Sequence, residues 1–333
     1  MKRCSALVAV ALVGTALAGC GGRQDEASTD AGGDVTCEVA QDTRIGIATG
    51  NSTGVYFALG NAYAEQLGAT GGKVKATASE TGASVQNIQQ LVAGSFGLAF
   101  SLADTAADAV NGTNSFTEKQ PIAAIARIHT NYNHVLVRKG AGITDVAGMR
   151  GRRVSTGSPK SGTEVIANRL LKAAGLDPAK DVKAQRLDLP KTVDAMKDGT
   201  IDAMFWSGGL PTPGITDLMT TSAGKVEFLD ITSLLPEMKK INPVYEEGTL
   251  PSAAYKTPAD VKTIVVPNVL LVRNDLDANV ACVLTKALFE RKPQLEQANA
   301  AAKEITLETA RKTDPVPLHR GAAKALDDLG APK

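Results

Sequence analysis

The sequence reads RIGIATGNSTG at residues 44–54 and RVSTGSPKSGT at residues 153–163. In both stretches a short apolar run ends in a turn of glycine and hydroxyl residues, and a helical pattern follows; Thr156 comes 107 residues after Thr49. Glycines permit sharp turns, hydroxyls supply donors, and a helix start offers unpaired N–H groups with about half a positive charge. Each stretch therefore predicts an anion-binding loop. The alternative is an ordinary strand-to-helix turn capped by Ser or Thr.

Short apolar runs alternate with helical patterns from Arg44 almost to the end of the chain. This alternation is typical of an α/β fold with mixed, mainly parallel sheets. In an open α/β sheet, ligands bind beyond the carboxyl ends of the strands. The two loops, one in each half, are therefore predicted to face each other across a cleft between two lobes. A chain of 333 residues, 43% of them hydrophobic, is long enough for two domains.

The composition excludes several classes of partner. With 36 basic and 35 acidic residues the formal charge is +1, so no field exists that would attract nucleic acid. Aromatic residues are 4% of the chain, which argues against a carbohydrate-stacking groove or a base-stacking platform.

The N-terminus has the pattern of a secretory signal. Lys2 and Arg3 precede an apolar run, 6–18, that is too short to span a membrane permanently. The run ends in Leu-Ala-Gly-Cys20, which resembles the bacterial lipobox. We therefore expect a lipoprotein signal peptide at 1–19, lipid on Cys20, a flexible tether over 20–42, and an extracytoplasmic protein anchored to a bacterial membrane. The alternative is a plain signal peptide with an incidental cysteine.

Two cysteines are left in the mature chain, Cys37 and Cys282. In an oxidising compartment an even pair predicts a disulfide, here between the start of the folded domain and a distant helix. The alternative is two buried thiols.

Signatures of catalysis are weak. Gly157 to Gly162 has the spacing of a phosphate loop, but Thr163-Glu164 replaces the required Lys and hydroxyl residue. The three histidines lack metal-ligand spacing, so no metal site, cofactor or enzymatic activity is expected. His129 lies at the predicted crossover between the lobes, where it is either a ligand contact or structural. A serine hydrolase using Ser158 or Ser161 is the rival hypothesis.

Several segments together resemble the TAXI family, the solute-binding proteins of TRAP transporters. The resemblance covers nearly the whole mature chain in order, and it is carried by IGIATGNSTGVYFALGNAYAEQL (45–67), ATASETGASVQNIQQLVAGSFGLAFSLADTAADAVNG (76–112) and the segments 146–176, 194–218, 283–310 and 315–326. It implies a type II periplasmic-binding-protein fold, a small organic anion such as glutamate or a dicarboxylate as ligand, TRAP membrane subunits as partners, and a monomer. A sensory protein that presents its ligand to a signalling receptor is the alternative.

The resemblance also implies domain limits and a ligand site. Lobe 1 is expected to comprise 43–131 plus 259–333, and lobe 2 residues 132–258. Arg127 is expected from a strand end as a ligand contact or a surface ion pair, Asp104 as a helix cap or a ligand acceptor, and Tyr56 as a cleft wall or a packing residue. The expected ligand-binding residues are Thr49, Gly50, Asn51, Ser52, Thr53, Gly54, Tyr56, Ser84, Ser101, Asp104, Arg127, His129, Ser158, Ser161, Gly162, Thr163, Trp206, Pro211 and Thr212.

Overall fold

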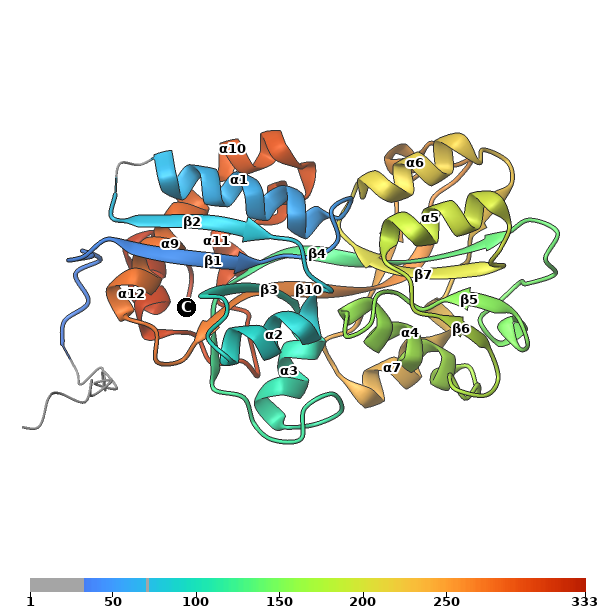
Figure 1. The fold of residues 1–333 in the computed structure, drawn as a ribbon, viewed down its shortest axis with the longest axis horizontal. Coiled ribbons are helices and arrows are strands. Elements are labelled where there is room, and N and C mark those ends of the chain that lie inside the picture. Colours follow the sequence, from blue (N-terminus) through green and yellow to red (C-terminus); the bar gives the residue numbers. More distant parts are fainter. Residues whose placement is uncertain (1–32, 70–71) are drawn as a thin grey trace, which may run out of the picture.

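The structure is a computed structural model that describes residues 33–69 and 72–333 (Figure 1). The predicted signal peptide, the lipidated Cys20 and most of the predicted tether lie outside the described residues. Over the part of the chain that is described, no helix is both long and apolar enough to cross a membrane.

Lobe 1 is built from both ends of the described chain. Three parallel strands form its outer part: β1 pairs in parallel with β2 on one side and with β3 on the other. Its elements are β1 (Thr43–Ala48), α1 (Val55–Ala69), β2 (Val74–Ser79), α2 (Ser84–Val92), β3 (Leu98–Leu102), α3 (Ala103–Asn111), α9 (Ala278–Glu290), α10 (Lys292–Ala298), the 3-10 helix η3 (Ala300–Glu304), α11 (Leu307–Ala310) and α12 (Arg320–Asp328).

Lobe 2 is formed by the middle of the chain. Its parallel strands are β5, β6 and β7, and helices cover both faces of them (Figure 1). Its elements are η1 (Ala147–Met149), β5 (Arg153–Ser155), α4 (Gly162–Ala173), β6 (Lys183–Gln185), α5 (Leu189–Asp198), β7 (Ala203–Gly208), α6 (Pro213–Thr221), β8 (Val226–Phe228), η2 (Thr232–Leu234), α7 (Leu235–Ile241), β9 (Glu246–Leu250) and α8 (Ser252–Tyr255).

Two long antiparallel strands, β4 (Ile122–Arg138) and β10 (Val261–Arg273), run from one lobe into the other (Figure 1). They join the strands of both lobes into one sheet of order β2-β1-β3-β10-β4-β7-β5-β6. The sheet is therefore mixed, with parallel pairs in each lobe and antiparallel pairs along the two connecting strands. The predicted α/β fold of two lobes is confirmed.

The packing of β10 bears on where the lobes divide. Ile264 and Val266 are buried in the apolar core of lobe 2, whereas Val269 and Leu270 are buried among residues of lobe 1. Between them the register of β10 against β4 shifts next to Pro267. We propose that the chain returns from lobe 2 to lobe 1 at Pro267, eight residues beyond residue 259, where the sequence led us to expect the return. The reason is that β10 is one continuous strand whose first part packs in the core of lobe 2 and whose second part packs in the core of lobe 1.

The disulfide between Cys37 and Cys282 is confirmed, with 5.2 Å between the Cα atoms. It ties the start of the described chain to α9. The side-chain oxygen of Asn279 also accepts hydrogen bonds from the N–H groups of Thr36 (2.9 Å) and Cys37 (3.0 Å). Residues 36–42, expected as the end of a free tether, are therefore attached to lobe 1 at their start.

Candidate functional site

The two glycine-and-hydroxyl loops meet between the lobes. The first follows β1 and leads into α1, and the second follows β5 and leads into α4. Asn51 Nδ2 lies 3.2 Å from Ser158 Oγ, and Asn51 Oδ1 accepts a hydrogen bond from the N–H of Leu189 at 3.0 Å. The carbonyl of Thr53 accepts one from the N–H of Gly214 at 3.3 Å. The lobes therefore touch directly at the two loops, as in a closed clamp.

A cavity lies beside this contact, and both loops contribute to its wall. Its empty volume, counted together with the solvent space at its mouth, is about 420 Å³. The wall also includes the indole of Trp206 and the side chain of Leu102. The cavity therefore suits a ligand of a few heavy atoms. The predicted ligand residues that line it are Gly50, Asn51, Gly54, Tyr56, Ser84, Ser161, Gly162, Thr163 and Trp206.

A second group of predicted residues supports the wall without lining it. Trp206 Nε1 donates to Thr212 Oγ1 at 3.2 Å, which orients the indole. Thr49 Oγ1 donates to the carbonyl of Ser79 at 2.6 Å, which fixes the start of the first loop. The members of this group are Thr49, Thr53, Ser158 and Thr212. Two predicted ligand residues lie outside both groups: Ser52 is exposed and its N–H donates to Glu80, and the carbonyl of Pro211 accepts a hydrogen bond from Asn299.

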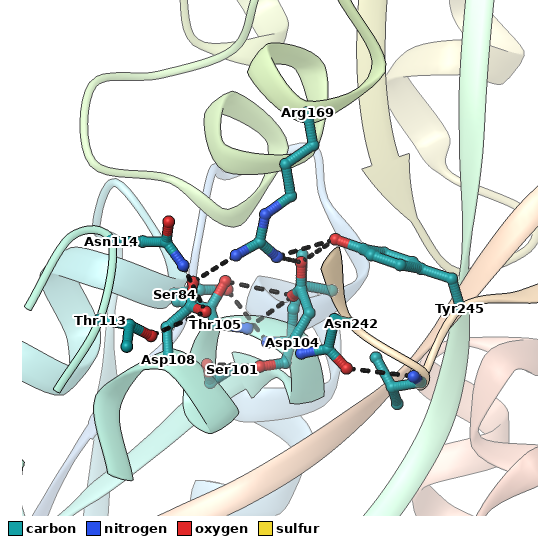
Figure 2. Close-up of polar contacts among 12 residues, drawn as sticks. Ser84, Ser101, Asp104, Thr105, Asp108, Thr113, Asn114, Arg169, Asn242 and Tyr245 are labelled. Atoms are coloured by element: carbon teal, nitrogen blue, oxygen red, sulfur yellow. Dashed lines mark hydrogen bonds and ion pairs between the residues drawn. The ribbon is translucent and has the colours of Figure 1, made fainter. Parts of the chain in front are cut away.

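Asp104 does not line the cavity. Figure 2 shows it among its polar partners instead. Its carboxylate is fully buried and lies 2.7 Å from a guanidinium nitrogen of Arg169, while Tyr245 also donates a hydrogen bond to it. Arg169 belongs to α4 of lobe 2, and its second nitrogen lies 2.5 Å from Asp108. The sequence expectation of a ligand contact is therefore corrected: Asp104 forms a buried ion pair between the lobes.

Ser101 and Arg127 do not line the cavity either. Ser101 is buried, and its hydroxyl donates to the carbonyl of Leu102 at 3.0 Å. Arg127 lines a different hollow, with Glu308 and Arg311. The expectation for Arg127 rested on its place at a strand end, and the expectation for Ser101 rested on the resemblance to TAXI proteins. The reason for their failure is that successive side chains of a strand point to opposite faces of the sheet.

His129 lies behind the cavity wall and is fully buried. Its ring packs edge-on against Tyr56, with 5.9 Å between the ring centroids, and neither ring nitrogen has a hydrogen-bond partner of ordinary geometry. Burial lowers the pKa of His129 to about 3, and a weaker contact with Asn131 offsets only part of this. His129 is therefore neutral near pH 7, and the structure favours the structural alternative for it. Burial likewise raises the pKa of Tyr56.

Sequence reasoning missed part of the wall. Asn131 lies on β4 where that strand passes between the lobes, and the residue is only 3% exposed. The Ser-Gly-Gly run at 207–209, where β7 ends, could have been found, because it directly follows the apolar part of that strand. The missed lining residues are Val55, Gly82, Ala83, Leu102, Asn131, Ser207, Gly208 and Gly209.

The geometry around the two candidate nucleophiles does not favour a hydrolase. Ser161 caps α4, because its oxygen accepts the N–H of Glu164 at 3.0 Å, and Ser158 bonds to Asn51. A hydrolytic serine needs a base within hydrogen-bond reach. Across residues 33–69 and 72–333, no histidine is hydrogen-bonded to either serine, and no group of three metal-binding side chains occurs.

Comparisons with known proteins agree with this architecture. A protein from Bordetella bronchiseptica has a solved structure that is similar with a TM-score of 0.54 and 20% sequence identity, covering 86% of this chain and 82% of that one. The binding protein component of an ABC phosphonate transporter from Pseudomonas aeruginosa is similar with a TM-score of 0.52 and 15% identity, covering 87% and 96%. These similarities show that this chain shares its two-lobed α/β fold with both proteins. The model of the NMT1-like family matches residues 47–330, so this chain belongs to the NMT1-like family.

Proposed function

We propose that this protein is an extracytoplasmic solute-binding protein, which captures a small organic anion between its lobes and delivers it to a membrane transporter. The observation that carries the proposal is the cavity formed where the glycine-and-hydroxyl loops of both lobes meet. Only a closed protein brings both loops to one ligand, so binding would shift an equilibrium between open and closed states.

The hydrogen bonds of the two candidate serines, Ser158 and Ser161, favour binding over turnover. Ser161 is engaged as a helix cap, and the described histidines make their contacts elsewhere. A hydrolase would need a serine hydrogen-bonded to a base, whereas Ser158 bonds to the Asn51 amide and Ser161 to the N–H of Glu164.

The sequence resemblance to TAXI proteins favours a TRAP carrier as the transporter and glutamate or a dicarboxylate as the ligand. One similar structure belongs to a component of an ABC phosphonate transporter, which makes an ABC system the second candidate. Uptake into vesicles that contain the membrane subunits separates the two. A TRAP carrier requires an ion gradient and is blocked by ionophores, whereas an ABC transporter requires ATP.

The anchor proposed on Cys20 has its own test. Fractionation of cells that express the wild-type chain is expected to place the protein with the membranes. Cys20→Ser removes the thiol that would carry lipid, so it is expected to release the protein from them. A variant that stays with the membrane would contradict the anchor and leave the binding proposal standing.

The binding proposal is tested by native mass spectrometry of the purified protein, followed by a thermal-shift screen of organic acids. A ligand at 100 times its dissociation constant is expected to stabilise the folded state by about 2.7 kcal/mol. A protein that carries no organic acid and is stabilised by none of those screened would refute the proposal.

A further inference from the structure

The wall of the cavity carries no charged side chain. Its lining residues, all within the described part of the chain, include no Asp, Glu, Lys, Arg or His. Two arginines of the connecting and lobe 2 strands are engaged elsewhere: the side chain of Arg153 forms two hydrogen bonds with Asp202, at 2.6 and 3.1 Å, and Arg127 lines another hollow. Asp104, a buried carboxylate behind the wall, is paired with Arg169. A ligand in the cavity therefore meets neutral groups only.

The positive potential comes from helix starts that meet at one place. α2 of lobe 1 and α4 of lobe 2 both begin on the wall, at Ser84 and Gly162. These starts are adjacent, because a Cβ on Gly162 would lie 2.7 Å from Ser84 Oγ. Each start contributes about half a positive charge, so together they match about one negative charge.

Donors remain available at this junction. In α4 the N–H groups of Glu164 and Val165 bond to Ser161, which leaves those of Gly162 and Thr163 for another acceptor. An independent observation lies on the same wall: the hydroxyl of Ser207 is buried, with the residue 6% exposed, and has no hydrogen-bond partner. A buried polar group without a partner is costly, so this hydroxyl points to a polar ligand atom.

The third helix start on the wall, that of α1, is covered by an apolar group. The indole of Trp206 lies 3.4 Å from the position of a Cβ on Gly54, just before α1 begins. Val55 and Leu102 add further apolar surface. This part of the cavity suits an uncharged portion of the ligand.

We propose that the ligand is a small organic monoanion without an ammonium group: one carboxylate or sulfonate head at the junction of α2 and α4, and an uncharged remainder beside Trp206. The proposal rests on the proposed binding function and narrows its ligand. A second carboxylate would find no cation on the wall, and an ammonium group would find no carboxylate. An unpaired charge in such a site is strongly disfavoured.

The test is calorimetric titration of the protein, stripped of retained ligand, with matched acids of equal length. Butyrate is compared with succinate, which adds a carboxylate, with 4-aminobutyrate, which adds an ammonium, and with propane-1-sulfonate, which changes the head. The same comparison is repeated with 2-hydroxy and 2-oxo acids. A monoanion is expected to bind about 100-fold more tightly than the matched acid that carries an additional carboxylate or ammonium group. The affinity of propane-1-sulfonate relative to butyrate shows whether the site prefers a sulfonate or a carboxylate head.

Ser207→Ala is expected to weaken the best monoanion about 10-fold, whereas Ser222→Ala, at a buried serine away from the cavity, is expected to leave its affinity unchanged. Tighter binding of succinate, 4-aminobutyrate or glutamate would overturn this inference and still support a binding protein. If no probe binds, the charge of the ligand retained in native mass spectrometry decides. A dianion or an amino acid overturns the inference, and the absence of any ligand overturns the binding function as well.

Discussion

Replacing Arg169 with methionine is expected to destabilise the contact between the lobes. Arg169 reaches from α4 to two carboxylates on α3, and the side chains of Arg169, Asp104 and Asp108 are only 7%, 0% and 7% exposed (Figure 2). Methionine keeps much of the side-chain volume but leaves two negative charges buried close together without a cation. The cause of the effect is therefore electrostatic rather than a loss of packing.

The magnitude follows from the burial of the pair. Removing one partner of a buried ion pair costs about 3 to 5 kcal/mol, since the remaining charge is left uncompensated. Some compensation persists in the variant, because Asp104 still accepts the N–H of Thr105 at 2.7 Å and Asp108 still accepts Asn114 Nδ2 at 2.8 Å. Burial raises the pKa of Asp108 even in the wild type, and in the variant protonation at lower pH would relieve the repulsion. The loss is therefore expected to be largest near pH 7 and smaller near pH 4.

Urea denaturation measures the loss, and small-angle X-ray scattering without urea reports whether the lobes separate. The matched control is Arg150→Met, because the pair of Arg150 with Asp181 is 59% exposed on the arginine side and is expected to contribute at most about 1 kcal/mol. A variant that adds Asp104→Asn and Asp108→Asn to Arg169→Met is expected to recover part of the stability. If Arg169→Met lost no more than the Arg150→Met control at pH 7, the reasoning would be refuted.

Three further outcomes are expected. Gly162→Ala would place a Cβ 2.4 Å from the Leu102 side chain across the cleft, so ligand affinity measured by calorimetry should fall at least about 10-fold, whereas Gly68→Ala, with open space around it, should change nothing. His129 stays neutral in the folded protein, with a pKa of about 3, but gains a proton in the unfolded chain below about pH 6.5. The free energy of unfolding should therefore fall by about 1.6 kcal/mol from this residue between pH 6.5 and 5, and His129→Gln should flatten the urea-derived pH profile by that amount. Cys282→Ser opens a 245-residue loop and should cost about 5 kcal/mol in the chain-entropy model; an unchanged urea midpoint would contradict this.

Much of the site could be predicted from the sequence because its decisive features are local. A turn of glycines and hydroxyls between an apolar strand and a helix has few other conformations, so Gly50, Asn51, Ser161 and Gly162 were placed correctly on the wall. The cysteine pair followed from counting, since two thiols in an oxidising compartment have only each other.

Other residues depended on partners far away in the chain. Asp104 follows a strand as a ligand residue would, but its partner Arg169 lies 65 residues further on and comes within reach only when the lobes pack together. Arg127 and Ser101 were wrongly expected at the cavity, because the face of the sheet to which a strand side chain points depends on how the strands of the whole sheet pair.

The sequence by itself determined the alternation of strands and helices, the paired loops and the disulfide, since each depends on neighbouring residues or on a count. Only the tertiary structure decided that the cavity carries no charge and that the ionic contacts lie between the lobes instead. The physical reason is that a charged side chain has no fixed role until packing determines which partner it reaches and how much water it loses.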